Sequence, residues 1–430
     1  MAPSALPPLR PQFAHRGRRT RPARRGIAHR GTPMSHQPGR HFLQIPGPTN
    51  VPLPILAATA RPVIDHRSAE FGQLGREVLA GIKTIFKTEN PVLIYAASGT
   101  GGWESALVNT LQAGDRVLMY ETGHFAALWE RMARKLSLKP EFIRGDWRSG
   151  VDVAAIEAHL AGDRQHGIKA VCIVHNETAT GTLSDVQGVR AALDRTGHPA
   201  LLMVDTISSL GSTDYRHDAW GVDVTVGGSQ KGLMLPPGLA FNAVSDKALA
   251  ASRQATLPRA YWDWEDMLAA NRTGYFPQTP AINLLYGLKV AIETLHAEGL
   301  DAVFARHARA AAATRAAVRH WGFETQCAVP AQASPTVTTV RMPEGHSADA
   351  FRALVLERFN MALGSGLGPL ADRVFRIGHI GDFNDLTIAG ALAGVEMGLA
   401  AAGIPHRAGG AAVAQAILGG KVEAFREAAE

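Results

Sequence analysis

Short apolar runs alternate with amphipathic stretches through the middle of the chain. The runs fall at residues 92–95, 116–120, 169–175, 201–205 and 222–226. Their lengths and their content of Val, Ile and Leu predict buried strands. Apolar residues at helical spacing predict helices between them, the clearest at residues 71–86 and 105–111. This alternation of strands and helices predicts an α/β domain with a mostly parallel sheet.

Polar or small residues follow each predicted strand. In open α/β sheets, ligands bind at the carboxyl ends of the strands. The residues at or near these ends are Ser98, Gly99, Thr100, Phe125, Thr178, Asp205 and Lys231. The Gly/Ser/Thr stretch at 98–102 is typical of an anion site, in which loop amides and a helix N-terminus face the ligand. Its spacing matches neither a dinucleotide fingerprint nor a P-loop, and a plain glycine turn is the alternative.

A single lysine, Lys231, follows the strand predicted at 222–226 and is flanked by glycine and apolar residues. Partial burial of a lysine favours the neutral amine, which is a nucleophile that can form a Schiff base. Asp205 ends another strand, where it either caps the next turn or supplies a buried carboxylate. An anion cradle, an aromatic ring, a carboxylate and a buried lysine are what a pyridoxal phosphate site requires. A surface lysine in a loop is the alternative.

The C-terminal part has a different pattern. The predicted elements are helices at 281–297, 301–321, 348–358 and 386–401 and strands at 337–340 and 374–377. From residue 325 on, this mixture predicts a smaller α+β domain. Arg376 lies inside an apolar strand. Because arginine is rarely buried without a partner, we expect an acid of the protein or of the substrate beside it.

These patterns divide the chain into five parts. They are an arm at 1–40, an extended segment at 41–64, a large domain at 65–298, a small domain at 299–402 and a tail at 403–430. Four prolines in residues 41–54 exclude a helix there and favour an extended or turning course. The Ala/Gly-rich tail is assigned no function.

Positive charge is concentrated at the start of the chain. The formal charge is +6, yet the first 33 residues hold eight arginines and no acidic residue, and without them the charge is −2. This Pro- and Arg-rich arm is predicted to be disordered. Three interpretations of the arm compete. It could bind nucleic acid or anionic surfaces, it could be a transit peptide, or it could be a leader upstream of a true start at Met34. We favour the leader and therefore expect no nucleic-acid partner.

The composition of the whole chain is that of an ordinary soluble globular protein, with 46% hydrophobic and 19% charged residues. No apolar run is long enough to span a membrane, so no membrane partner is expected. Cys172 and Cys327 cannot build a disulfide framework or a metal cluster unaided, and no metal is expected. The last three residues do not form the peroxisomal Ser-Lys-Leu signal, and we expect a cytoplasmic location.

Seven motifs, in order between about residue 41 and about residue 400, are similar to those of one family. They are Ile45-Pro46-Gly47-Pro48-Thr49-Asn50, Asp65-His66-Arg67-Ser68, Ala97-Ser98-Gly99-Thr100-Gly101-Gly102-Trp103-Glu104, His175-Asn176-Glu177-Thr178-Ala179-Thr180-Gly181, Val204-Asp205, Gly228-Ser229-Gln230-Lys231-Gly232 and Phe375-Arg376-Ile377-Gly378. Each is weak alone, but together they are highly specific. On these motifs the chain resembles the serine–glyoxylate and alanine–glyoxylate aminotransferases of class V and of pyridoxal-phosphate fold type I, and most of all the bacterial serine–glyoxylate enzymes.

The resemblance implies a pyridoxal 5′-phosphate site in the large α/β domain. Lys231 matches the lysine that forms the internal aldimine and later moves protons. Asp205 matches the aspartate that pairs with the pyridinium nitrogen, and Arg376 matches the arginine that binds the substrate carboxylate. The remaining cofactor contacts that carry over are Ser98, Gly99, Thr100 and Gln230 at or beside the phosphate, Thr178 near the ring oxygen and Phe125 against the ring.

The resemblance also implies a homodimer with composite active sites. Tyr275 and Thr279 match residues that reach the phosphate from the partner subunit, and Gln278 is the alternative to Thr279. The implied reaction is ping-pong transamination between small amino acids and 2-oxo acids, from L-serine to glyoxylate, giving hydroxypyruvate and glycine. Aspartate and alanine are the alternative donors. Cysteine desulfurases share the fold type, but neither cysteine of this chain lies where a mobile nucleophile is needed.

Overall fold

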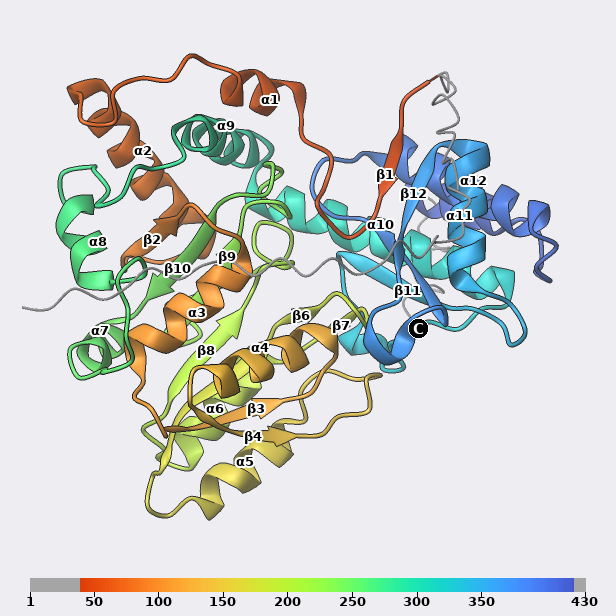
Figure 1. Cartoon of the computed structure of the whole chain (residues 1–430). Helices are drawn as coiled ribbons and strands as arrows, with labels where there is room; N and C mark the ends of the chain where they lie inside the picture. The colour runs from red at the N-terminus through yellow and green to blue at the C-terminus, as the bar shows by residue number, and fades with distance from the viewer. Residues whose placement is uncertain (1–38, 421–430) are drawn as a thin grey trace, which may run out of the picture. The chain divides into compact units, whose positions relative to one another are not determined.

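A seven-stranded sheet forms the centre of the larger part of the structure (Figure 1). Its strand order is β2 (Val92–Tyr95), β10 (Ala240–Val244), β9 (Val224–Gly228), β8 (Leu201–Asp205), β5 (Ile168–Val174), β3 (Arg116–Tyr120) and β4 (Lys139–Ile143). Strand β10 is antiparallel to both of its neighbours, and every other pair is parallel. The predicted α/β fold with a mostly parallel sheet is confirmed. The computed structural model describes residues 39–420, so the expectations for the arginine-rich arm, for Met34 and for residues 428–430 lie outside it.

Helices cover both faces of this sheet, because alternate residues of each strand point to opposite sides. In β2, Val92 and Ile94 pack into one apolar cluster, and Leu93 and Tyr95 pack into another. The helices on the first side are α2 (Ala69–Phe86), α9 (Ile282–Glu298), α5 (Val153–Gly162) and α6 (Val186–Arg195). Those on the second side are α3 (Gly99–Thr110), α4 (His124–Lys135), α7 (Asp246–Ser252) and α8 (Trp264–Asn271). A small hairpin, β6 (Asn176–Glu177) and β7 (Thr182–Leu183), follows β5.

A second sheet of four strands carries the C-terminal part. Its order is β1 (Phe42–Gln44), β12 (Met361–Ser365), β13 (Val374–Gly378) and β11 (Val337–Arg341). The predicted strands at 337–340 and 374–377 are confirmed as β11 and β13. Around this sheet pack α10 (Leu300–Trp321), α11 (Ala348–Phe359), α12 (Asp385–Ala401) and α13 (Gly410–Leu418), and two 3₁₀ turns, η1 (Pro330–Gln332) and η2 (Gly368–Leu370), flank β11 and β13. Strand β1 comes from the start of the described chain and pairs in parallel with β12.

The structure corrects two expectations about local structure and adds a helix in the tail. The segment at 41–64 is not extended throughout, since α1 (Leu53–Thr59) lies in it; Pro54 is tolerated in the first helical turn, where no backbone N–H bond is required. The helix predicted from residue 105 begins six residues earlier, at Gly99. The tail contains α13, whose Ala414 and Ile417 are buried against the small-domain helices. None of the helices in the described range is long and apolar enough to cross a membrane.

One close backbone contact fixes the position of α2. A β-carbon on Gly75 would overlap the carbonyl oxygen of Gly274, which immediately precedes Tyr275. We therefore expect Gly75→Ala to lower the free energy of unfolding by about 1–3 kcal/mol, because neither backbone segment can yield easily. Gly81→Ala on the same helix is the control. Its β-carbon would lie 3.3 Å from the flexible Ile292 side chain, and helix propensity favours alanine by about 1 kcal/mol. Urea unfolding measures both, and equal stabilities of the two variants would contradict the expectation.

Candidate active site

The carboxyl ends of four parallel strands and of β2 meet at one edge of the seven-stranded sheet. Strand β2 runs in the same direction as β9, because β10 is antiparallel to both. The structure therefore brings the ends that carry Ser98, Phe125, Thr178, Asp205 and Lys231 to a single edge, as the sequence predicts. These residues are far apart in the sequence, and contacts made by the folded chain bring them together.

Lys231 follows β9 and meets the N-terminal segment. Its Nζ donates a hydrogen bond to the carbonyl oxygen of Pro46, and a β-carbon on Gly47 would lie 2.7 Å from the same Nζ. Gly47 has a φ of +103°, so glycine is required there both by the backbone and by the lysine. Burial of the amine and the positive charge of Arg376 lower the pKa of Lys231 to about 8, against the opposing effect of Asp205 and Glu177. With this pKa about a tenth of the amine is neutral at pH 7, far more than for an exposed lysine.

Asp205 is a buried carboxylate at the end of β8. Its Oδ1 accepts a hydrogen bond from the Ile207 N–H at 2.7 Å, and its Oδ2 accepts one from Trp103 Nε1 at 3.0 Å. Trp103 is itself held in a stack on Trp129, with ring centroids 5.8 Å apart. Burial raises the pKa of Asp205 to about 7 even though these bonds and Lys231 oppose the rise. A cation beside this carboxylate would restore its charge, which suits a protonated ring nitrogen.

The start of α3 suits a phosphate. Ser98 is the N-cap residue, and its side chain makes no capping bond, so its hydroxyl is not used by the helix. A β-carbon on Gly228 would lie 3.2 Å from Oε1 of Gln230 and 3.7 Å from the N–H nitrogen of Gly99, so these two groups converge there. Oε1 of Gln230 is buried without a hydrogen-bond partner in the described structure. The donors that suit a phosphate here are the N–H groups at the start of α3 and the uncommitted Ser98 hydroxyl, whereas Oε1 of Gln230 is an acceptor and would need a donor of its own.

Arg376 lies on β13 and reaches across to the β6–β7 hairpin that follows β5. Its Nε donates to the Ser365 carbonyl at 2.7 Å and its Nη1 to the Thr178 carbonyl at 3.0 Å. Within residues 39–420 no carboxylate forms an ion pair with this buried guanidinium. The sequence leads us to expect an acid of the protein or of the substrate beside it, and only the substrate acid is left. Burial lowers the pKa of Arg376 to about 10, yet it stays charged at neutral pH. Its position fits the binding of a carboxylate.

Glu177 is a site residue that the sequence analysis did not single out. It is fully buried, and its carboxylate accepts hydrogen bonds from the N–H groups of Phe125 (3.0 Å), Ala126 (3.2 Å) and Ala179 (3.0 Å). A β-carbon on Gly123 would lie 2.6 Å from its Cγ. Glu177 thereby ties the start of α4, which carries Phe125, to the turn that carries Thr178. The only signal in the sequence is an acidic residue inside an otherwise uncharged stretch after β5.

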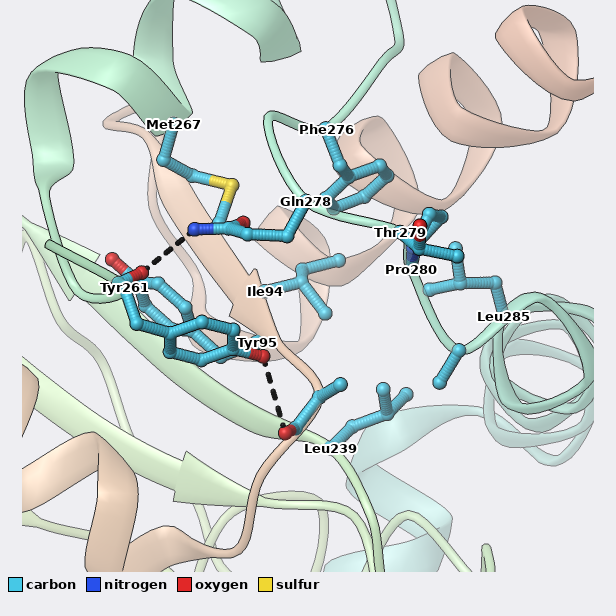
Figure 2. A pocket seen from close by; sticks show the side chains of 12 residues that line it. Ile94, Tyr95, Leu239, Tyr261, Met267, Phe276, Gln278, Thr279, Pro280 and Leu285 are labelled. Atoms are coloured by element: carbon cyan, nitrogen blue, oxygen red, sulfur yellow. Dashed lines mark hydrogen bonds between the residues drawn. The ribbon is translucent and has the colours of Figure 1, made fainter. Parts of the chain in front are cut away.

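Tyr275 and Thr279 are not joined to the other site residues within the described chain. The hydroxyl of Tyr275 donates to the Ser68 carbonyl at 3.2 Å, and its ring packs on Phe71 of α2. Thr279 lines a small cavity beside the end of β2, shared with Gln278 (Figure 2). The amide of Gln278 donates back to the Tyr261 carbonyl at 2.8 Å.

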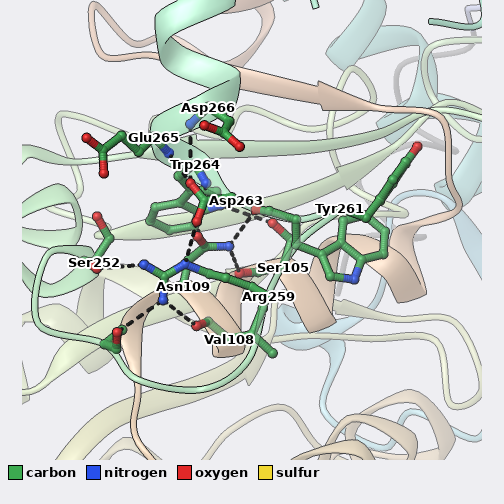
Figure 3. Close-up of polar contacts among 12 residues, drawn as sticks. Ser105, Val108, Asn109, Ser252, Arg259, Tyr261, Asp263, Trp264, Glu265 and Asp266 are labelled. Carbon is green, nitrogen blue, oxygen red and sulfur yellow. Dashed lines mark hydrogen bonds and ion pairs between the residues drawn. The ribbon is translucent and has the colours of Figure 1, made fainter. Parts of the chain in front are cut away.

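Polar contacts anchor the segment that leads to these residues (Figure 3). Arg259 donates to the carbonyl oxygens of Ser252 and Val108, at the ends of α7 and α3, and forms an ion pair with Asp263. Asn109 of α3 donates to the Trp262 carbonyl at 2.7 Å. The segment is therefore fixed to the same helix, α3, whose N-terminus faces the site.

The site contains no metal centre in the part of the chain that is described, since no three His, Cys, Asp or Glu residues are grouped to hold an ion. Cys172 is buried in β5, and burial raises the pKa of its thiol.

A family model and three known proteins resemble the chain. Residues 54–370 match the model described as aminotransferase class-V. The serine–glyoxylate aminotransferase of Methylorubrum extorquens is 46% identical over 391 residues, which cover 89% of this chain and 97% of that protein. The L-aspartate–glyoxylate aminotransferase of Paracoccus denitrificans is 45% identical over 373 residues (86% and 94%). The structure of pyridoxamine–pyruvate aminotransferase from Mesorhizobium loti matches with a TM-score of 0.83 at 28% identity, over 88% of this chain and 97% of that chain.

Capture of pyridoxal phosphate by the cofactor-free protein should accelerate with pH around a midpoint of about 8. Only a neutral amine attacks an aldehyde, and burial together with Arg376 brings the pKa of Lys231, the lysine that the sequence predicts to react, down from about 10.4. Stopped-flow absorbance measures the rate constant. Arg376→Gln removes one positive charge and should move the midpoint upward. A wild-type midpoint near about 10, or an unchanged midpoint in the variant, would contradict this assignment.

Glu177→Gln should change how stability depends on pH. The pKa of Glu177 is about 7 in the folded protein and about 4.3 in an exposed glutamate. The folded state therefore binds more protons between these values, so the contribution of Glu177 to the free energy of unfolding is present at low pH and is lost as the pH rises through about 7. The advantage of wild type over the variant should shrink by about 1.4 kcal/mol for each unit by which the pKa is raised.

Urea unfolding of the cofactor-free proteins across this pH range provides the measurement. Glu121→Gln is the matched control, because the Glu121 carboxylate is bound by Trp147 and Arg144 and is only partly buried. Its difference from wild type should vary much less with pH. If the difference in the free energy of unfolding from wild type changed with pH in the same way for both variants, Glu177 would have no special role.

Proposed function

Since the chain belongs to the class-V aminotransferase family, we propose that it transfers the amino group of L-serine to glyoxylate with pyridoxal 5′-phosphate, giving hydroxypyruvate and glycine. The observation that carries the proposal is the convergence of Lys231, Asp205 and Arg376 at one sheet edge, where each is buried or held by backbone groups. Relatives that bear the serine–glyoxylate name at 43–47% identity support this choice of substrates.

Three side chains of this chain have distinct tasks in the proposed reaction. When bound, the cofactor supplies an electron sink for the bond to the substrate Cα. Asp205 would place a negative charge beside the ring nitrogen and would keep that nitrogen protonated. Arg376 would bind the carboxylate of the amino acid and later of the 2-oxo acid, which would fix Cα in front of Lys231. Lys231 would take the Cα proton as a general base and pass it on within the same half-reaction, and in the second half-reaction it would deliver a proton to Cα of the 2-oxo acid.

The remaining residues hold and orient the cofactor. In the proposal Ser98, Gly99 and Thr100 bind the phosphate at the start of α3, with Gln230 beside them. Thr178 would lie by the ring oxygen and Phe125 against the ring, and Glu177 holds the backbone beside both, through the N–H groups of Phe125 and Ala179. This division leaves the guanidinium of Arg376 for the substrate.

We also propose a cytoplasmic homodimer in which Tyr275 and Thr279 serve the phosphate site of the partner subunit. Two observations support it. The contacts of Tyr275 within its own chain are with α2, away from Lys231. The segment around α1 also leaves large apolar side chains exposed, with Leu53 at 76% and Val63 at 67%.

Aspartate is the second candidate donor, on the strength of the L-aspartate–glyoxylate relative. An aspartate donor would bring a second carboxylate into the site. The two carboxylates of Asp205 and Glu177 are balanced in the site by the positive groups of Lys231 and Arg376, so charge alone does not select the donor. Serine is the first choice because three relatives at 43–47% identity bear the serine–glyoxylate name.

The purified protein should carry pyridoxal phosphate on Lys231 and should use serine with glyoxylate in preference to other donors. Absorbance near the visible edge and borohydride reduction, followed by peptide mapping, locate the cofactor. An amino-acid panel with glyoxylate as the acceptor identifies the donor. A colourless protein or labelling at another lysine would refute the site. Predominant use of aspartate would refute the choice of serine.

A further inference from the structure

His124 is an imidazole at the candidate site that the proposed reaction does not use. It is the first residue of α4 and directly precedes Phe125, with the two rings edge to face and 5.6 Å between centroids. The ring is half-buried, and no residue in the described range forms a hydrogen bond with it. His124 therefore lies beside Phe125, which is proposed to pack against the cofactor ring, and its two ring nitrogens are free to bind a ligand.

The loop after β12 connects His124 to the substrate-binding arginine. Ser365, at the end of β12, accepts the hydrogen bond from Nε of Arg376. Three residues later, Gly368 reaches the imidazole: a β-carbon there would lie 3.3 Å from Nδ1 of His124 and 3.3 Å from Cη2 of Trp147. Gly368 has a φ of +56°, so both its backbone and the approach require glycine. One short loop thus touches the guanidinium at one end and the imidazole at the other.

The electrostatic surroundings keep this imidazole neutral. Burial lowers the pKa of His124, and the positive charges of Arg131 and Arg376 lower it further. A neutral imidazole offers one hydrogen-bond donor and one acceptor. Those are the two functions that a hydroxyl group can satisfy at the same time, whereas a methyl group satisfies neither.

We propose that His124 determines donor specificity by hydrogen-bonding the side-chain hydroxyl of a β-hydroxy α-amino acid. This inference rests on the proposed function. With its carboxylate on Arg376 and its amino group toward Lys231, the donor places its side chain toward the wall formed by His124 and the loop at 365–368. A serine hydroxyl there completes the hydrogen bonding of the imidazole, and an alanine methyl leaves the imidazole unpaired in a partly desolvated place.

His124→Ala and His124→Asn test the inference with serine and alanine as donors and glyoxylate as acceptor. In His124→Ala we expect kcat/KM for serine to fall about tenfold and that for alanine to change by less than about twofold. His124→Asn retains a donor and an acceptor and should recover part of the serine activity. Arg131→Ala is the matched control, since it removes a nearby positive charge from the same helix and leaves the imidazole. It should alter both donors by less than about twofold.

A binding measurement separates recognition from turnover. 2-Methylserine and 2-aminoisobutyrate differ by one hydroxyl group, and neither carries a Cα proton, so both bind without being transaminated. Titration of each into the holoenzyme, followed by absorbance, should show that wild type prefers 2-methylserine and that His124→Ala has lost the preference. Circular dichroism and thermal unfolding of the variants show whether α4 remains folded.

Two failures can be told apart. If wild type does not transaminate serine with glyoxylate, the proposed function fails and the inference falls with it. If wild type uses serine but His124→Ala loses serine and alanine activity equally, or retains the preference for 2-methylserine, the inference alone is overturned. A serine-selective loss in Arg131→Ala would likewise overturn it, because a field effect would then explain the selectivity.

Discussion

The site depends on four ionisable groups buried close together with no ion pair joining them in the described structure. Asp205 is compensated by the Ile207 N–H and Trp103, and Glu177 by three backbone N–H groups. Lys231 is bonded to the Pro46 carbonyl, and Arg376 to those of Ser365 and Thr178. Burying charges is unfavourable unless they are paired or hydrogen-bonded, and here neutral dipoles provide the hydrogen bonds. A salt bridge within this group would occupy the carboxylate or the guanidinium, which the proposed function reserves for a ring nitrogen and for a substrate carboxylate.

The sheet edge could be predicted from the sequence because it depends on local signals. Each buried strand shows as an apolar run, and parallel strands bring their ends together whatever the details of packing. Asp205, Lys231 and the start of α3 follow from this rule. Strand β10 was not predicted, although its presence decides that β2 runs in the same direction as β9. Nor was the early start of α3, since Gly99, Gly101 and Gly102 have low helix propensity; glycine is needed there because a β-carbon would meet Ile207, Trp262 and Val226.

Glu177 and His124 illustrate what sequence patterns cannot supply. The importance of Glu177 comes from amides that lie more than fifty residues away, at the start of α4. The importance of His124 comes from a loop of the other sheet that only glycine allows to approach. Both relations are made by tertiary packing, so no periodicity or spacing along the chain reports them. Tyr275 and Thr279 are a third kind of case, because the proposed recipient of these side chains is another molecule.

The N-terminal segment has contacts with both sheets within a few residues. Strand β1 ends at Gln44 as part of the four-stranded sheet. Two residues later, the carbonyl oxygen of Pro46 accepts a hydrogen bond from the amine of Lys231. Thr49 then donates hydrogen bonds to the carbonyl oxygens of Lys231 and Gln230. This segment therefore connects the two sheets. A rotation of the small sheet against the large one would carry the Pro46 carbonyl with it and would change the hydrogen-bond partner of the reactive amine. The surroundings of the Lys231 amine therefore depend on the relative position of the two sheets as well as on its immediate neighbours.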